Sequence, residues 1–226
     1  MLTQKIMSNK EFSGHRKVGQ SMLHNLEQRF VAWGTPKIPK RIETWTLTYM
    51  TGIWSIFVLI FGYMAQYNIH WLWGSSLMII AQYLTDLFDG AVGRYRNTGL
   101  IKWGYYADHF LDYIFMCCIL IGYTFFIPDP YNVLFYILVI YGAFLVNAFI
   151  SFAAINKFRI SYFGVGPTEA RIGFIIANTM LVWFGKIFLS QFLPHLLVLS
   201  FMALLLVVYK TQKYIWEMDM KEKNKQ

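Results

Sequence analysis

The chain has 226 residues, of which 57% are hydrophobic and 14% charged, and its formal net charge is +8. An average soluble domain is about 45–50% apolar and about 25% charged, so this composition argues against a single water-soluble core. The 19% of aromatic residues excludes a disordered chain, and the adjacent Cys117 and Cys118 give no disulfide framework.

Residues 1–44 are polar and basic, but they contain one periodic apolar pattern. Its members recur every three or four residues and are Val18, Met22, Leu26, Phe30 and Trp33. This spacing predicts an amphipathic helix that lies along the membrane surface before the first span. A helix packed on another part of the protein is the alternative.

Long apolar segments follow Arg41 and lead to an all-α integral membrane fold with six transmembrane helices. The predicted spans are 45–66, 71–90, 104–126, 132–156, 171–189 and 196–212. Each is close to the roughly 20 residues that cross a bilayer. The links near 67–70, 127–131 and 190–195 are short, so consecutive spans should be antiparallel. We therefore expect a membrane domain over 45–213, between a cytoplasmic N-terminal segment (1–44) and a basic tail (214–226).

The basic residues predict the orientation of these spans. Every lysine and arginine except Lys186 lies before the first span, in or at the border of the second or fourth loop, or at or beyond the end of the sixth span. By the positive-inside rule, both termini and the two longer loops are then cytoplasmic. The positive charge is thus explained by topology and anionic lipid, and no nucleic-acid-binding module accompanies it.

Four of the twelve acidic residues fall in one short segment, at the predicted cytoplasmic ends of the second and third spans. They are Asp86, Asp89, Asp108 and Asp112. Residues three or four apart on a helix share a face, so both pairs can point into one small volume. An Asp at the centre of a membrane helix costs about 2.5–3.5 kcal/mol, and clustered like charges repel one another.

A bound divalent metal explains four such acids better than chance does. Oxygen ligands favour a hard cation, Mg²⁺ or Mn²⁺, whose coordination is often completed by substrate phosphate. Gly90, Gly93 and Gly104 leave room for a ligand, and Arg94 is suited to bidentate phosphate binding. The pattern therefore predicts a metal and phosphate site on the cytoplasmic face.

The segment 86–112 resembles the signature of the CDP-alcohol phosphotransferases, D-x2-D-G-x2-A-R followed by G-x3-D-x3-D. Every fixed position is present except the alanine, which is Gly93 here. The resemblance implies that Asp86, Asp89, Asp108 and Asp112 bind metal, with two Mg²⁺ or Mn²⁺ ions expected. It also implies that Gly90, Arg94 and Gly104 line the pocket for the cytidine nucleotide and its pyrophosphate, together with Asp86 and Asp108. The implied reaction is attack by an alcohol on CDP-linked phosphorus with release of CMP.

Two further features resemble the choline/ethanolamine phosphotransferase branch of that family. The first is the pair Asp108-His109, and the second is the segment Gly166-Pro167-Thr168-Glu169. In that branch the histidine is the proposed general base and the glutamate assists it, which is consistent with an imidazole pKa near working pH. If His109 is only an interfacial residue, Asp112 is the next candidate for the base. Glu169 also suits the simpler role of an acid at a helix N-terminus.

The sequence departs from that branch in two respects. Eukaryotic members have about ten spans, and the entry to the first span here, Ile42 to Thr48, lacks the Pro-Asn start common in the family. Six spans are usual in relatives that transfer a phosphatidyl group from CDP-diacylglycerol to inositol phosphate, glycerol phosphate or serine. We expect phosphoethanolamine or phosphocholine transfer to a lipid hydroxyl, with the CDP-diacylglycerol reaction as the alternative. The expected partners are the CDP-linked donor, a lipid or small-alcohol acceptor, membrane lipids and, by family habit, a second copy of the chain.

A divalent cation transporter is the rival from another class. The position of all four acids at one predicted face, without acidic partners at mid-membrane in the later spans, argues against it. Lys157, Arg159 and Arg171 flank the fourth loop. We expect them to be positive-inside anchors, and binding of an acceptor phosphate is the alternative.

Overall fold

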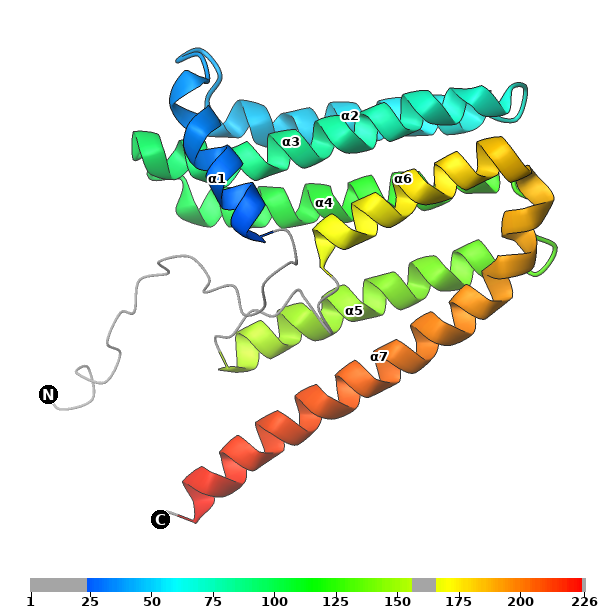
Figure 1. Cartoon of the computed structure of the whole chain (residues 1–226). Helices are drawn as coiled ribbons and strands as arrows, with labels where there is room; N and C mark the ends of the chain where they lie inside the picture. Colours follow the sequence, from blue (N-terminus) through cyan, green and yellow to red (C-terminus); the bar gives the residue numbers. More distant parts are fainter. Residues whose placement is uncertain (1–23, 156–165, 225–226) are drawn as a thin grey trace, which may run out of the picture.

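The structure is a computed structural model that describes residues 24–155 and 166–224. Within those residues the chain is helical and contains no strand, which confirms the all-α prediction. The elements, labelled in Figure 1, are α1 (His24–Gly34), η1 (Thr35–Lys37), α2 (Thr44–Met64), η2 (Ile69–Trp71), α3 (Leu72–Arg96), α4 (Ile101–Thr124), α5 (Val133–Ile155), α6 (Pro167–Phe184) and α7 (Lys186–Lys223).

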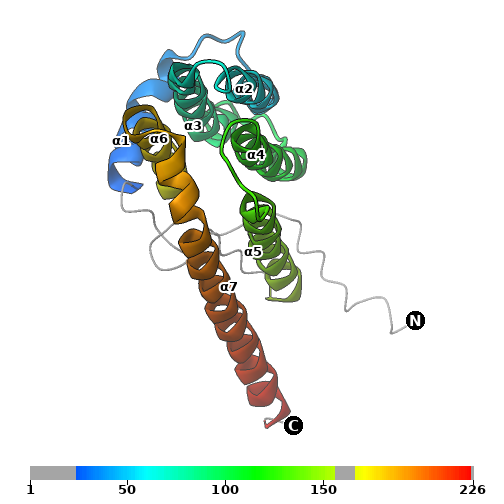
Figure 2. The same cartoon turned by 90° about the vertical axis from the view of Figure 1, so that its right-hand side faces the viewer.

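The long helices α2 to α6 lie along roughly the same direction, α7 runs obliquely beside α5, and short α1 crosses α3 at one end of the molecule (Figure 1). The links at 65–71 and 125–132 and the break at Gly185 lie at the opposite end. The link between α3 and α4 and the start of α6 lie at the same end as α1. Figure 2 shows α5 and α7 extending away from the group formed by α2, α3, α4 and α6.

The core lies where α2, α3, α4 and α6 pack together. Its most buried apolar side chains include Val58, Ile79, Phe115 and Leu181. Helices α2 and α4 approach closely at Gly62, because a Cβ atom there would lie 2.7 Å from the Cα of Gly122. Small residues at such crossings let backbones meet, as is common between membrane helices.

Among the described residues, three helices are long and apolar enough to cross a membrane: α2, α5 and α7. Helices α3 and α4 carry the four clustered aspartates, and α6 has only 18 residues and carries Glu169 and Arg171. Composition alone therefore does not mark α3, α4 and α6 as spans. The structure is consistent with a membrane protein, while the six-span topology and its sidedness stay predictions.

The boundary between the last two predicted spans was placed wrongly. No link interrupts 190–195, because α7 runs through those residues and contains Pro194. The break falls at Gly185 instead, whose φ of 84° is a left-handed value that glycine adopts without strain. Pro194 cannot donate a backbone hydrogen bond, which favours a kink, and Figure 1 shows α7 bending near its start.

The N-terminal amphipathic pattern is only partly covered by the structure. Leu26, Phe30 and Trp33 lie on α1 and are exposed, whereas Val18 and Met22 lie outside the described residues. The segment after α1 is held to the end of α3 by Arg96, which donates to the carbonyl oxygens of Ile42 at 2.6 Å and Ile38 at 2.9 Å. Contact of α1 with a membrane surface stays a prediction.

Candidate metal centre

Three of the four predicted aspartates meet at the facing ends of α3 and α4. Asp86, Asp108 and Asp112 each offer one carboxylate oxygen, and these oxygens all lie within 4.8 Å of one another. Helical spacing produces this arrangement, since Asp108 and Asp112 are one turn apart on α4 and face the last turns of α3. The three side chains are partly exposed, so ions and small ligands have access to them.

Asp89 takes a different position from the other three. It is buried, and its Oδ2 accepts a hydrogen bond of 2.6 Å from the hydroxyl of Thr48 on α2. Its Oδ1 is also buried and has no hydrogen-bond partner among the described residues. Its expected role as a metal ligand therefore stays a prediction, and the sequence did not indicate Thr48 as its partner.

Arg171 is buried and lies against the acidic cluster, a contact that the sequence did not indicate. Its Nη2 lies 2.9 Å from Oδ2 of Asp86 and 3.2 Å from Oδ1 of Asp112. The start of α6 supplies this guanidinium, which thus joins α6 to both α3 and α4. Because one guanidinium faces three carboxylates, the cluster keeps an excess of negative charge when all three are ionised.

Gln82 is a second contact of the cluster that the sequence did not indicate. It lies one helical turn before Asp86 on α3 and is fully buried, and its Nε2 donates to Oδ1 of Asp112 at 2.8 Å. Asp112 Oδ1 therefore receives both Gln82 and Arg171. The sequence does contain one indication of this contact: Gln82 is a polar residue in an apolar segment, and it lies four residues before Asp86 on the same helix face.

His109 lies beside the cluster and faces the helix α5. Its Nδ1 lies 3.2 Å from Oδ2 of Asp108. Its ring centroid lies 4.5 Å from that of Tyr105 and 6.1 Å from that of Phe149 on α5. When Nδ1 carries the proton and donates it to Asp108, Nε2 is left as the basic nitrogen of the imidazole.

Glu169 lies in the first turn of α6. Its Oε2 accepts a hydrogen bond of 2.8 Å from the backbone N–H of Gly166, which closes a capping box at the start of the helix. Glu169 thus stabilises the N-terminus of α6, which is the simpler of the two roles predicted from the sequence. Assistance of His109 by Glu169 stays a prediction.

Glu27 of α1 connects three helices next to the site. Its Oε1 accepts hydrogen bonds of 2.9 Å from the hydroxyls of Tyr83 on α3 and Thr168 on α6. The ring of Tyr83 also lies 5.8 Å from the guanidinium carbon of Arg171. Glu27 thereby helps to fix the start of α6, and with it Arg171, relative to α3.

The predicted phosphate-binding residues lie next to open space. Arg94 is exposed and forms no ion pair or hydrogen bond with the described part of the chain. A Cβ at Gly90 would meet only the flexible Arg94 side chain, and a Cβ at Gly104 would have nothing within 4 Å. A ligand can therefore approach the α3 and α4 backbones at these two glycines.

The glycine that replaces the signature alanine has a specific neighbour. A Cβ at Gly93 would lie 2.9 Å from Oγ1 of Thr44, the first residue of α2. The same hydroxyl lies 3.4 Å from the carbonyl oxygen of Asp89. In this chain the space of an alanine methyl group is thus filled by a threonine from the neighbouring helix.

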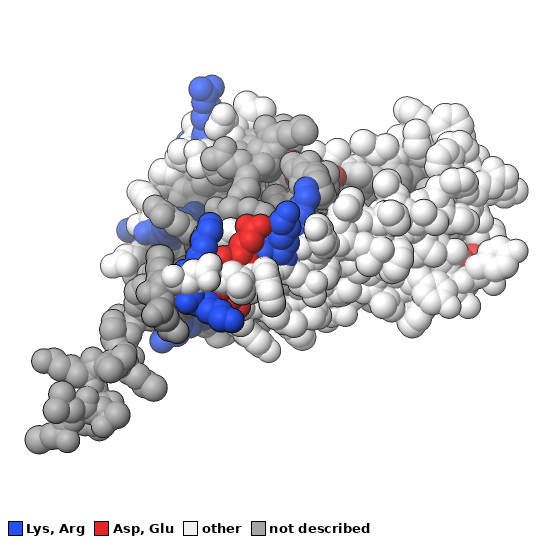
Figure 3. Space-filling view, turned by 90° about the horizontal axis from the view of Figure 1, so that it is seen from below, with Lys and Arg blue, Asp and Glu red and all other residues white. Residues whose placement is uncertain are grey.

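The donor set of the cluster fits a hard divalent cation. It consists of carboxylate oxygens alone, which Mg²⁺, Mn²⁺ and Ca²⁺ prefer. Oxygens on opposite sides of Mg²⁺ lie about 4 Å apart, so oxygens within 4.8 Å of one another need only small side-chain rotations to share an ion. Figure 3 shows acidic residues flanked by basic ones toward one end of the molecule, whereas the other end is almost free of charge on this face.

Apolar helices of membrane-spanning length and an acidic cluster near the exposed Arg94 are the features expected of an enzyme that handles phosphate groups at a bilayer. The profile of the CDP-alcohol phosphatidyltransferase family matches residues 44–210, more than half of the chain, and the chain therefore belongs to this family. Searches of curated proteins and of solved structures give no match.

Membership of the family establishes the general reaction. The chain is a transferase of substituted phosphate groups that acts in phospholipid synthesis. The family implies a CDP-alcohol donor and an alcohol acceptor, and its members typically depend on divalent cations. The acidic triad of α3 and α4 is the group of side chains that suits such a cation.

Proposed function

We propose that the chain transfers a phosphoalcohol, such as phosphoethanolamine or phosphocholine, from its CDP carrier to the hydroxyl group of a lipid and releases CMP. The observation that carries this proposal is the contact between His109 and Asp108. It puts a potential base beside the carboxylates that suit a metal, with Nδ1 at 3.2 Å from Asp108. A general base is required where the attacking group is a neutral hydroxyl.

The proposed roles follow from the positions of the side chains. Asp86, Asp108 and Asp112 would hold Mg²⁺ or Mn²⁺, and Asp89 is proposed as a further ligand. The bound cations supply Lewis-acid stabilisation of charge on the pyrophosphate. Arg94, next to the open space at Gly90 and Gly104, binds phosphate oxygens of the donor.

His109 acts on the acceptor. Nε2 of the imidazole takes the proton of the lipid hydroxyl, whose oxygen forms a bond to the phosphorus that carries the alcohol. The bond between that phosphorus and the oxygen of CMP breaks, and CMP leaves with the electron pair. Asp108 orients the imidazole and stabilises its charged form, and Glu169 is proposed to support it from the start of α6.

Asp112 is less suited than His109 to be the base. Its Oδ1 already accepts hydrogen bonds from Gln82 and Arg171, so this oxygen is occupied and less available to take the proton of an acceptor hydroxyl. We therefore propose that Asp112 binds the cation and that Gln82 and Arg171 orient it.

The CDP-diacylglycerol reaction is the competing assignment within the family. Six long helices, α2 to α7, favour it, because that size is usual among the relatives that use this donor. In that case a small alcohol attacks a phosphatidyl group, and the lipid is the donor.

One experiment separates the two assignments. Purified protein in detergent with Mg²⁺ receives either CDP-ethanolamine or CDP-choline with diacylglycerol, or CDP-diacylglycerol with inositol phosphate, glycerol phosphate or serine. We expect CMP release in the first combination. Release only in the second would overturn the proposed direction of transfer.

Replacing His109 tests its role as the base. His109→Ala should lower kcat about 10²–10⁴-fold, the usual contribution of general acid–base catalysis, and leave donor binding unchanged. The measurements are CMP release and equilibrium binding of the CDP-linked donor. An unchanged kcat would return the role of base to Asp112.

A further inference from the structure

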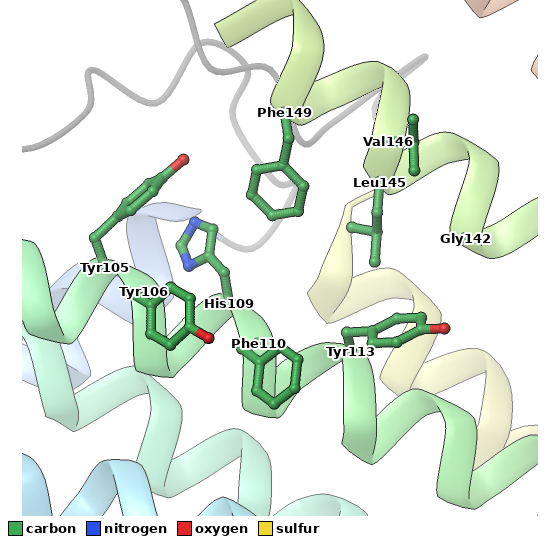
Figure 4. Close-up of a pocket in the computed structure, with 9 residues that line it drawn as sticks. All are labelled: Tyr105, Tyr106, His109, Phe110, Tyr113, Gly142, Leu145, Val146 and Phe149. Atoms are coloured by element: carbon green, nitrogen blue, oxygen red, sulfur yellow. The ribbon is translucent and has the colours of Figure 1, made fainter. Parts of the chain in front are cut away.

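An apolar groove adjoins the acidic cluster between α4 and α5. It encloses about 540 Å³, within the usual range of ligand pockets, and His109 forms part of its wall (Figure 4). The other large side chains in its lining are aromatic on α4 and apolar on α5, and they include Tyr105, Tyr106, Phe110, Leu145, Val146 and Phe149. Among the described residues, no Asp, Glu, Lys or Arg side chain lines it.

We infer that this groove holds an acyl chain of the acceptor lipid, a neutral lipid with a free hydroxyl, and so brings that hydroxyl to His109. The inference rests on the proposed function and assigns the place of the acceptor within it. A lipid acceptor needs an apolar channel that ends at the reacting atoms, and the groove meets both requirements.

Continuity with the acidic cluster is the first argument. His109 packs its ring near the rings of Tyr105 and Phe149, which line the groove, while its Nδ1 contacts Asp108. Figure 4 shows the imidazole between α4 and the Phe149 ring. One side chain thus borders both the apolar space and the acidic triad.

Access from the side is the second argument. Tyr106, Phe110 and Val146 are 67%, 51% and 56% exposed, so the rim lies on the outer surface of α4 and α5. Helix α5 is among the helices suited to cross a membrane. A lipid can therefore enter the groove from the bilayer while its polar end stays at the charged end of the helices.

The uncharged lining contributed by the described parts of α4 and α5 favours a neutral lipid. The nucleotide donor is expected at Gly90, Arg94 and Gly104, where phosphate oxygens find a cation and open backbone. Gly104 is one helical turn before Asp108 and shares its face of α4, whereas His109 and Tyr113 lie on the face that borders the groove. Donor and acceptor then approach the aspartates from two sides of α4.

Filling the groove tests the inference. Gly142 of α5 lines it, and a Cβ there would have nothing within 4 Å, so Gly142→Leu obstructs the groove without a backbone clash. We expect the KM for dioleoylglycerol to rise about 10-fold in detergent micelles, and the KM for CDP-ethanolamine to change less than about twofold. Gly52→Leu is the matched control, because Gly52 is also a helical glycine with nothing within 4 Å and does not line the groove.

A second readout needs no turnover. A diacylglycerol with a diazirine in one acyl chain is photolysed with the purified protein, and the labelled peptides are mapped. Labelling of α4 and α5 that Gly142→Leu reduces and Gly52→Leu retains supports the inference. If Gly142→Leu does not purify as a folded protein, Val146→Phe at the exposed rim provides the same obstruction.

Three results would overturn the assignment. Labelling confined to other helices places the acceptor elsewhere. Displacement of the label by CDP-diacylglycerol but not by dioleoylglycerol makes the groove a donor site. A change in oligomeric state in Gly142→Leu with unchanged labelling makes it a contact between copies of the chain. Loss of CMP release with every donor, with labelling intact, would contradict the proposed reaction and not the lipid site.

Discussion

The two ends of the helix bundle use their carboxylates differently. At the end opposite α1, Asp129 accepts hydrogen bonds of 2.8 Å from the backbone N–H groups of Val133 and Leu134, at the start of α5. At the other end, Asp86, Asp108 and Asp112 turn their oxygens toward one another. One acid stabilises a helix start, and three acids form a cluster of like charge.

The difference distinguishes an acid that stabilises a helix, Asp129, from acids whose positions favour binding of a cation. An acid at a helix N-terminus stabilises that helix through its orphan backbone donors. Three carboxylates within 4.8 Å of one another repel, and Arg171 offsets only part of that charge. A divalent cation bound at the cluster, as proposed above, would balance the remainder.

The largest expected effect comes from the cluster. Asp108→Asn should lower turnover at least about 10³-fold, because it removes a charge at the reacting phosphates. The same change should leave the thermal stability without divalent ions unchanged or higher, since one repulsive charge is gone. CMP release and the melting temperature in detergent measure both. Near-normal turnover would refute the cluster as the reaction site.

Arg171→Gln removes the positive charge that is paired with Asp86 and Asp112. Removing one partner of a buried ion pair costs about 3–5 kcal/mol, and about 2 kcal/mol is expected here because the Asp86 and Asp112 side chains are 24% and 28% exposed. The apparent affinity for Mn²⁺ should rise roughly 10-fold, since a competing cation is lost. The melting temperature is measured against Mn²⁺ concentration.

Arg171→Lys, which keeps the charge, is the control for that variant. It should retain more of the stability in the absence of Mn²⁺ than Arg171→Gln does. Equal Mn²⁺ dependence in the wild type and Arg171→Gln would mean that the guanidinium and the cation do not share the cluster.

Asp129→Asn is the matched change at the opposite end. It should cost about 1 kcal/mol of stability, because the amide nitrogen cannot accept a hydrogen bond and one of the two backbone N–H groups loses its acceptor, and it should leave turnover unchanged. The assays are those used for Asp108→Asn. A loss of turnover beyond the fraction of unfolded protein would erase the contrast between the two ends.

The smallest effect is expected from a change of shape at the acidic end. Gly93→Ala gains about 1 kcal/mol of helix propensity but pushes a methyl group against Thr44 Oγ1, so the net change should be within about 1 kcal/mol. In a Thr44→Ala background the same change should be stabilising by about 1 kcal/mol. A double-mutant cycle in thermal unfolding measures the coupling, and additive effects would contradict the contact.

Periodicity and hydropathy predicted the helices better than their ends. Apolar segments and short links indicated α2 to α5, because a helix of that length must bury apolar surface or meet lipid. The break at Gly185 was missed since a single glycine gives little signal, whereas the sequence around Pro194 resembled a link. Backbone conformation at Gly185, which the neighbouring helices determine, decided the boundary.

The site was predictable where one helix face supplies it. The spacing of Asp108 and Asp112, together with the resemblance over 86–112, predicted that these acids lie close together. Partners from other helices were not predictable: Thr48 on α2 binds Asp89, and Arg171 on α6 binds Asp86. These contacts depend on how helices pack, for which a single sequence gives no periodic signal.

Direct binding of Mn²⁺ tests the central claim that the acidic cluster is a cation site. The signal of free Mn²⁺ in electron paramagnetic resonance is recorded as purified wild-type protein, Asp108→Asn and Asp129→Asn are titrated. The account predicts that the wild type and Asp129→Asn remove Mn²⁺ from solution and that Asp108→Asn loses this binding. Equal binding by all three proteins, or no binding by the wild type, would contradict it.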